Sequence, residues 1–156
     1  MTKFHQGFFK PKNPKKYAGD PKKIVFRSSW EFLVMDRFDR NPNIVEWASE
    51  EFFIRYFDPV TQKARRYFPD FIVKVKKDNK IVKQLVEIKP ANQCFKPRKK
   101  KNTQSYINEC KTYMTNMAKW SAAKNFCKTK NMEFIIVSRN PVNSEFIILT
   151  EAEVGF

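Results

Sequence analysis

The residues of this chain best suited to catalysis are two carboxylates and a lysine near its middle. Asp70 follows Pro69, and Glu87 and Lys89 stand two positions apart. Side chains alternate along a strand, so Glu87 and Lys89 should project to one face. Carboxylate oxygens suit Mg²⁺, a bound ion polarises a phosphate and activates a water, and a lysine orients that water or stabilises charge on the phosphorane. This set is therefore suited to phosphodiester hydrolysis.

Glu31 is a further acid with two open interpretations. It can reach the waters of a metal held by Asp70 and Glu87. Alternatively, Ser28 and Glu31 form an S-x-x-E capping box, in which the glutamate only caps a backbone N–H. The pair Glu87 and Lys89 has its own plain alternative, an ion pair on a solvated face of a sheet.

Apolar spacing and turn signals predict the elements that must position these residues. A helix is expected over residues 29–40, capped by Ser28 or Ser29 and ended before Asn41-Pro42. β-Branched and aromatic runs predict further strands, and helical spacing predicts one or two helices divided at Asn116. The expected strands are 44–48, 51–57, 66–76, 81–89, 132–137 and 146–149, with the second helical region at 103–130.

The order of these elements predicts an α/β fold. The first four strands are expected to be sequential and antiparallel, and a strand after a crossover helix extends them into a central mixed sheet with flanking helices. Residues 1–23 carry seven lysines, one acid and three prolines, so they are predicted to be a basic arm without regular structure. The arm lies along the fold or a phosphate backbone, or its first ten residues are a solvated tail. Residues 24–156 are expected to form a single domain.

Composition indicates a polyanionic partner. The formal charge is +15 with a pI near 9.8, which favours a nucleic acid, and the 42% hydrophobic content excludes a disordered basic tail. The basic residues expected to hold DNA phosphates flank the acids, although any one lysine can equally be solvated. They are Arg65, Arg66, Lys96, Arg98, Lys99, Lys100 and Lys101. The sixteen phenylalanines are interpreted mostly as core.

Counting excludes other chemistries. His5 is the one histidine, which argues against a Ser-His-Asp triad or a His-based zinc site. Three glycines cannot build a phosphate-binding loop, so no nucleotide cofactor is expected. The three cysteines lack a C-x-x-C pair and are interpreted as reduced thiols of a cytosolic protein. No signal peptide or long apolar run occurs, so no membrane association is expected.

Three motifs together resemble the PD-(D/E)xK nuclease superfamily, which has a restriction-endonuclease-like αβββαβ core. They are Glu31 on a helix, Pro69-Asp70 at the start of a strand and Glu87-Ile88-Lys89 at the end of the next strand. Four longer strings are similar to the small head-completion nucleases of contractile-tailed phages and to the endonuclease subunit of certain cut-and-paste transposons. These strings are Arg27-Ser28-Ser29-Trp30-Glu31, Trp47-Ala48-Ser49-Glu50, Tyr67-Phe68-Pro69-Asp70-Phe71 and Val86-Glu87-Ile88-Lys89-Pro90.

The resemblance implies that Glu31, Asp70, Glu87 and Lys89 form the catalytic site. Asp70, Glu87 and Glu31 would hold Mg²⁺, or Mn²⁺ in its place. The transposon subunit often has glutamine at the position of Glu87 and carries a further C-terminal domain, so the phage nuclease is the closer expected relative. Such proteins are implied to act on the ends of packaged double-stranded DNA in the host cytoplasm or in the virion, with portal or neck proteins as partners.

Two alternatives do without cleavage. In the first, a structural DNA-binding protein keeps the fold and closes a capsid vertex. In the second, an RNA-binding protein uses the positive face alone and is indifferent to metal. The intact set of Glu31, Asp70, Glu87 and Lys89 favours the enzyme over both.

Overall fold

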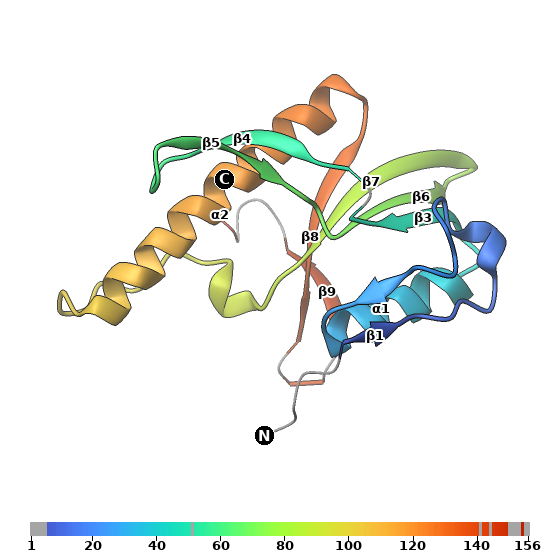
Figure 1. Ribbon diagram of the computed structural model, residues 1–156, viewed down its shortest axis with the longest axis horizontal. Helices are drawn as coiled ribbons and strands as arrows, with labels where there is room; N and C mark the ends of the chain where they lie inside the picture. The colour runs from blue at the N-terminus through green and yellow to red at the C-terminus, as the bar shows by residue number, and fades with distance from the viewer. Residues whose placement is uncertain (1–5, 51, 141, 144, 150–153, 155–156) are drawn as a thin grey trace.

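A five-stranded mixed sheet forms the centre of the computed structural model, which describes residues 6–50, 52–140, 142–143, 145–149 and 154 (Figure 1). Within this sheet, β7 and β8 pair in parallel, after the crossover through helix α2, and the other described pairs are antiparallel. Around the sheet, the chain order α1-β3-β6-β7-α2-β8 is αβββαβ, which confirms the restriction-endonuclease-like core. The sheet order is β3 (Ile44–Ser49), β6 (Phe71–Lys77), β7 (Lys80–Ile88), β8 (Glu133–Arg139) and β9 (Phe146–Leu149).

A separate hairpin interrupts the strand order that the sequence predicts. β4 (Ile54–Asp58) and β5 (Lys63–Tyr67) pair only with each other and pack on α2, while β3 pairs with β6. The expectation of sequential antiparallel strands is therefore wrong for β3 and β4. The single strand predicted at 66–76 is also wrong, because it breaks at Pro69, which lacks the N–H that a ladder needs.

Both helices begin at a side-chain cap. α1 (Ser29–Arg40) has the predicted bounds, and Ser28 caps its first turn. α2 (Gln104–Thr129) is one continuous helix, in which the Thr103 hydroxyl oxygen accepts a 3.2 Å hydrogen bond from the Tyr106 N–H. Asn116, considered as a possible division, is buried within it. The alternative of two helices is thus excluded.

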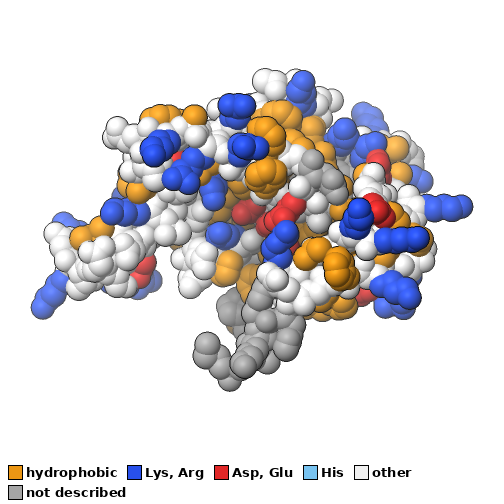
Figure 2. All heavy atoms as spheres, viewed as in Figure 1, with side chains coloured by type: hydrophobic (Ala, Val, Ile, Leu, Met, Phe, Trp, Pro, Cys, Tyr) orange, Lys and Arg blue, Asp and Glu red, His pale blue; other side chains and the backbone are white. Residues whose placement is uncertain are grey.

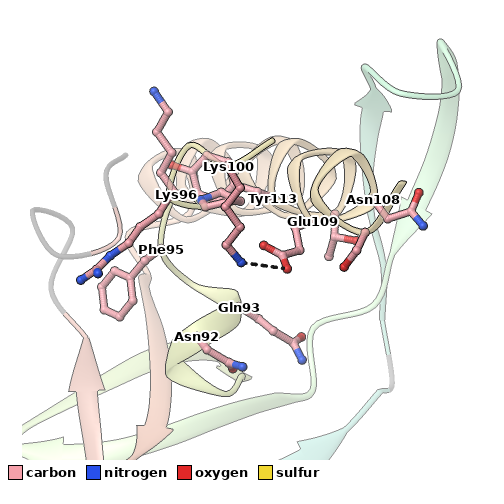
Figure 3. A pocket seen from close by; sticks show the side chains of 12 residues that line it. Asn92, Gln93, Phe95, Lys96, Lys100, Asn108, Glu109 and Tyr113 are labelled. Carbon is pink, nitrogen blue, oxygen red and sulfur yellow. Dashed lines mark ion pairs between the residues drawn. The ribbon is translucent and has the colours of Figure 1, made fainter. Parts of the chain in front are cut away.

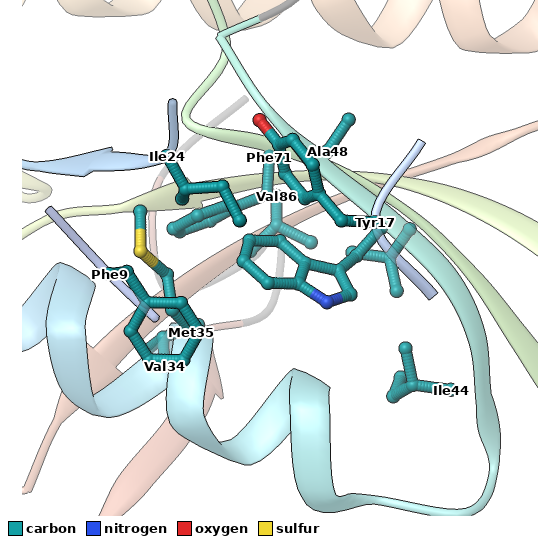
Figure 4. Packing of buried hydrophobic residues seen from close by; sticks show 11 residues of the cluster. Phe9, Tyr17, Ile24, Val34, Met35, Ile44, Ala48, Phe71 and Val86 are labelled. Atoms are coloured by element: carbon teal, nitrogen blue, oxygen red, sulfur yellow. The ribbon is translucent and has the colours of Figure 1, made fainter. Parts of the chain in front are cut away.

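Two hydrophobic cores cover opposite faces of the sheet. Because side chains alternate along β7, Val86 packs on the α1 side and Leu85 on the α2 side. In the α1 core, Phe9, Tyr17 and Met35 converge from three segments of the chain (Figure 4). α2 and the β4–β5 hairpin together cover the other face.

Part of the basic segment 1–23 is built into the fold. β1 (Gly7–Phe8) pairs with β2 (Val25–Phe26), and a 3₁₀ turn covers Pro14–Lys16, so the expectation that these residues lack regular structure is wrong. The Lys16 ammonium group donates hydrogen bonds of 2.8–3.0 Å to three carbonyls at the C-terminal end of α1. Since those carbonyls have no partner within the helix, this lysine acts as a cap. The segment from Gly7 onward therefore lies along the fold.

Two smaller expectations concern the cysteines and the membrane. Cys94, Cys110 and Cys127 are free thiols, and burial raises the pKa of Cys94 and of Cys127 to about 11. Within the described part of the chain, no helix combines the length and the apolar character needed to cross a membrane.

Candidate active site

The candidate site lies where the ends of three neighbouring strands, β3, β6 and β7, lie side by side. β3 and β7 both run antiparallel to β6, so their C-terminal ends lie beside the N-terminal end of β6. Glu50 directly follows β3, Asp70 directly precedes β6, and Glu87 stands at the penultimate position of β7. The topology thus brings together acids that are far apart in sequence.

Three carboxylates form a cluster at these strand ends. Glu31, Glu50 and Asp70 each offer an oxygen atom, and these atoms lie within 4.8 Å of one another. A cavity of about 330 Å³ opens beside them, lined by residues that include Glu31, Asp70 and Pro90. Figure 2 shows acidic side chains in the middle of this face, among lysines and arginines.

Asp70 is held by the backbone on two sides. Its carboxylate accepts a 2.7 Å hydrogen bond from the N–H of Ile88, and its carbonyl accepts a 3.2 Å bond from the N–H of Glu50. Burial, and then the charge of Glu87, raises the pKa of Asp70 well above its ordinary value. A divalent cation would relieve this repulsion, because it favours the ionised form.

Glu31 makes capping contacts at the start of α1 and also lies in the acidic cluster. Its N–H donates a 3.0 Å hydrogen bond to the Ser28 hydroxyl oxygen, and its carboxylate accepts a 3.2 Å bond from the N–H of Arg27, one residue before the expected capping-box partner. The same carboxylate belongs to the acidic cluster. Burial raises the pKa of Glu31, and the nearby charge of Glu50 adds to the rise. The capping contact therefore orients the acid toward the cluster.

Glu50 is the site residue that sequence reasoning missed. It has a left-handed backbone with φ of 50°, and it forms an ion pair with Arg27. No strand periodicity marks a residue in such a turn, and the one signal was its place at the end of the string Trp47-Ala48-Ser49-Glu50. The turn carries Glu50 out of the strand and toward the other acids.

Glu87 lies beside the cluster but outside the group of three. Its carboxylate accepts a 2.6 Å hydrogen bond from the Tyr67 hydroxyl and is buried. Burial raises the pKa of Glu87, whereas the Tyr67 hydrogen bond, Lys89 and Lys119 lower it. The Lys119 ammonium nitrogen lies 5.8 Å from the Tyr67 ring centroid. On balance burial prevails and the pKa of Glu87 is raised, although these three groups favour its charged form.

Lys89 follows β7 directly. Its N–H donates a 3.0 Å hydrogen bond to the Val137 carbonyl, which continues the parallel pairing with β8. The side chain is partly exposed, and its charge lowers the pKa of Glu87. The charge of Lys89 thus acts on Glu87, the acid that precedes it by two positions in the E-x-K spacing.

The predicted DNA-binding residues fall into two groups. Lys96, Arg98 and Lys100 line a groove of about 1140 Å³ between the loop after β7 and α2. Figure 3 shows Lys100 reaching Glu109 across it, at 3.7 Å between the charged atoms. Lys99 and Lys101 are exposed on the same loop. The second group is Arg65 and Arg66, both exposed on β5.

The donor set fits a hard divalent cation. Three carboxylate oxygens lie close enough to share one ion, and oxygen ligands are those that Mg²⁺ and Mn²⁺ prefer. The central mixed sheet, its two helices and the acidic cluster at the strand ends define a protein of the restriction-endonuclease-like class.

Comparisons with known proteins agree. Residues 41–139 match the family model described as TnsA-like endonuclease N terminal. The head completion nuclease of Enterobacteria phage T4 is 36% identical over 141 residues, covering 87% of this chain and 92% of that protein. The chain therefore belongs to the TnsA-like endonuclease N-terminal family, and the nuclease class predicted from the sequence is confirmed. No solved structure matches it.

Proposed function

We propose that this chain is a Mg²⁺-dependent DNA endonuclease that hydrolyses phosphodiester bonds and accepts Mn²⁺ in place of Mg²⁺. The observation that carries the proposal is the convergence of the Glu31, Glu50 and Asp70 oxygens within 4.8 Å. The T4 relative is named a head completion nuclease. By that likeness, the substrate is the end of packaged phage DNA during head completion.

Each residue has a chemical task in this proposal. Asp70, Glu31 and Glu50 hold the ion, and Glu87 adds a fourth carboxylate beside them. When bound, the ion polarises the phosphate and lowers the pKa of a water molecule. Lys89 orients that water and stabilises negative charge on the phosphate oxygens. Asp70 keeps its position through the Ile88 N–H whether or not it carries a proton.

The basic groups supply affinity rather than sequence specificity. Lys96, Arg98, Lys99, Lys100 and Lys101 follow the active-site strand and are suited to the phosphates beside the scissile bond. Arg65 and Arg66 extend this surface along β5. In the cell, the proposal implies action in the host cytoplasm during assembly or in the virion, next to portal or neck proteins.

The test is cleavage of linear and supercoiled plasmid DNA by wild type, Lys89→Ala and Asp70→Asn, with Mg²⁺, Mn²⁺ or EDTA. We expect metal-dependent cutting by the wild type and none by either variant, with DNA affinity retained. Asp36→Asn is the matched control, because this partly exposed acid on α1 forms an ion pair with Arg40 and should leave cutting unchanged. Cutting by Asp70→Asn at the wild-type rate would contradict the site.

The alternatives predict other outcomes. A non-catalytic protein that closes a capsid vertex binds DNA and never cuts it with any metal. An RNA-binding protein prefers RNA and ignores metal. A transposase-type endonuclease subunit has the same metal-dependent chemistry but needs its partner subunits to cut at element ends.

A further inference from the structure

Two exposed phenylalanine rings form a pair next to the acidic cluster. Phe53 is 39% exposed and Phe68 is 45% exposed, and their ring centroids lie 5.6 Å apart. The Arg66 guanidinium group lies 5.2 Å from the centroid of the Phe53 ring. Figure 2 shows hydrophobic side chains beside the acidic ones in the middle of this face. Two rings in contact form a larger exposed apolar patch than a single ring does, and larger apolar patches mark interaction sites.

Packing of the neighbouring residues holds both rings outward. Phe68 lies between Tyr67, which is 4% exposed, and Pro69, which is fully buried. Phe53 directly precedes Ile54, which is buried in the hydrophobic core between the sheet and α2. Because the anchored neighbours point inward, the rings between them must face solvent. Folding therefore presents the two rings without covering them.

Chain connectivity places the pair close to the reacting phosphate. Phe68 is two residues before Asp70, so their Cα atoms are at most about 7 Å apart. Phe53 is three residues after Glu50, which allows at most about 11 Å. A hydrogen bond from the Glu50 N–H to the Asp70 carbonyl ties the two segments together. One strand of DNA advances about 3.4 Å per nucleotide, so the rings stand within a few nucleotides of the acids.

Charge identifies the occupant of this surface as a nucleic acid. The strand that carries Arg66 also exposes Lys63 and Arg65, and the whole chain has a net charge of +15. Aromatic rings and arginine planes stack on unpaired bases, whereas bases inside a duplex already stack on each other. The pair is thus suited to a base that has left the duplex.

We propose that Phe53 and Phe68 stack on an unpaired base next to the cleaved phosphate. The preferred substrate is then DNA with unpaired nucleotides beside a duplex, such as a frayed end, a flap or a junction, rather than continuous duplex. This inference rests on the proposed function, since it specifies the DNA on which that site acts.

The test measures binding in EDTA, where metal-dependent cleavage does not occur. The probes are a blunt duplex and the same duplex with two unpaired 2-aminopurine nucleotides at one end, whose fluorescence falls on stacking. We expect the wild type to bind the second probe more tightly and to quench it. The double variant with Phe53→Ala and Phe68→Ala should bind the probe with unpaired nucleotides about 5- to 100-fold more weakly than wild type does. Its affinity for the blunt duplex should be unchanged. Phe68→Trp should retain it.

Phe57→Ala is the matched control, because this ring is 61% exposed on the same hairpin but lies at its far end, beside the β4–β5 turn. It should leave both affinities unchanged. Thermal unfolding of each variant confirms folding. Equal binding of both probes by the wild type, or unchanged binding by the double alanine variant, would overturn the inference. If the wild type binds the probe with unpaired nucleotides more tightly but cuts DNA with no metal, the stacking surface is supported and the nuclease proposal is rejected.

Discussion

The hydroxyl group of Tyr67 donates a 2.6 Å hydrogen bond to the Glu87 carboxylate inside the protein, where both side chains are buried. Tyr67 is the last residue of the inserted hairpin, and Glu87 lies on a central strand of the sheet. The hairpin therefore does more than cover the α2 face, because it supplies the group that holds a candidate catalytic acid.

Removing this hydroxyl group should cost stability. Tyr67→Phe leaves a buried carboxylate without its donor, so the free energy of unfolding should fall by about 1–3 kcal/mol. Chemical denaturation measures the loss. Tyr56→Phe, on the neighbouring strand β4, is the matched control and should lose less stability, since the hydroxyl group bonded to the Glu87 carboxylate is that of Tyr67. Equal losses in the two variants would contradict the role assigned to Tyr67.

The raised pKa of Asp70 predicts a pH dependence of the metal-free protein. The folded state binds this proton more tightly than the unfolded chain, so the stability contributed by Asp70 is fully present below the unfolded-state pKa, near 3.8. It is lost as the pH rises through the folded-state pKa. In EDTA, Asp70→Asn should thus become more stable relative to wild type as the pH rises above the unfolded-state pKa. Chemical denaturation at several pH values measures this difference, and a constant difference for Asp70→Asn would refute the prediction.

Glu50 should contribute to metal binding. Glu50→Gln keeps the shape of the side chain but removes one of three clustered charges, so the dissociation constant for Mn²⁺ should rise by at least about tenfold. Titration calorimetry measures it. Glu46→Gln, on β3 and paired with Lys74 at 2.7 Å, is a matched control with no expected effect. Unchanged Mn²⁺ affinity in Glu50→Gln would remove this residue from the site.

Asp39 should anchor the N-terminal segment. It is 1% exposed, and its carboxylate accepts hydrogen bonds of 2.7 Å from the N–H of Lys12 and 3.0 Å from that of Asn13. Asp39→Ala should lower the free energy of unfolding by about 2–4 kcal/mol, because both donors lose a charged acceptor. Hydrogen exchange should accelerate at the amides of Lys12 and Asn13. Unchanged exchange there would show that the segment is held by other contacts.

The basic groove should account for part of the salt dependence of DNA binding. Each phosphate contact contributes about 0.9 to the slope of log affinity against log salt concentration, so Lys96→Ala with Arg98→Ala should reduce the slope by about 1.8. Anisotropy titrations at several salt concentrations measure it. The matched control is Lys76→Ala with Lys80→Ala, which should keep the slope. These two lysines lie beside the β6–β7 turn, at the opposite end of the strands from the candidate site. Equal effects of the two pairs would mean that the groove has no special role.

Local chemistry allowed the sequence to determine several elements directly. The helix at 29–40 and the strand at 146–149 have their predicted bounds, since apolar spacing and a Ser28 cap act over a few residues. Asp70, Glu87 and Lys89 were recognisable for the same reason, as polar groups among apolar neighbours or at a strand-like spacing. The family relationship and the αβββαβ core followed from those strings.

Only the tertiary structure decided which distant residues share the site. β3 pairs with β6 across the hairpin, and this pairing brings Glu50 to Asp70 while Tyr67, rather than the cluster, holds Glu87. Likewise, Phe53 and Phe68 are exposed, although the composition predicts that most of the phenylalanines belong to the core. Strand partners and burial depend on contacts between segments far apart in the chain, which local spacing does not encode. The sequence thus determined the residue types available for catalysis, and the long-range pairing of strands determined their arrangement.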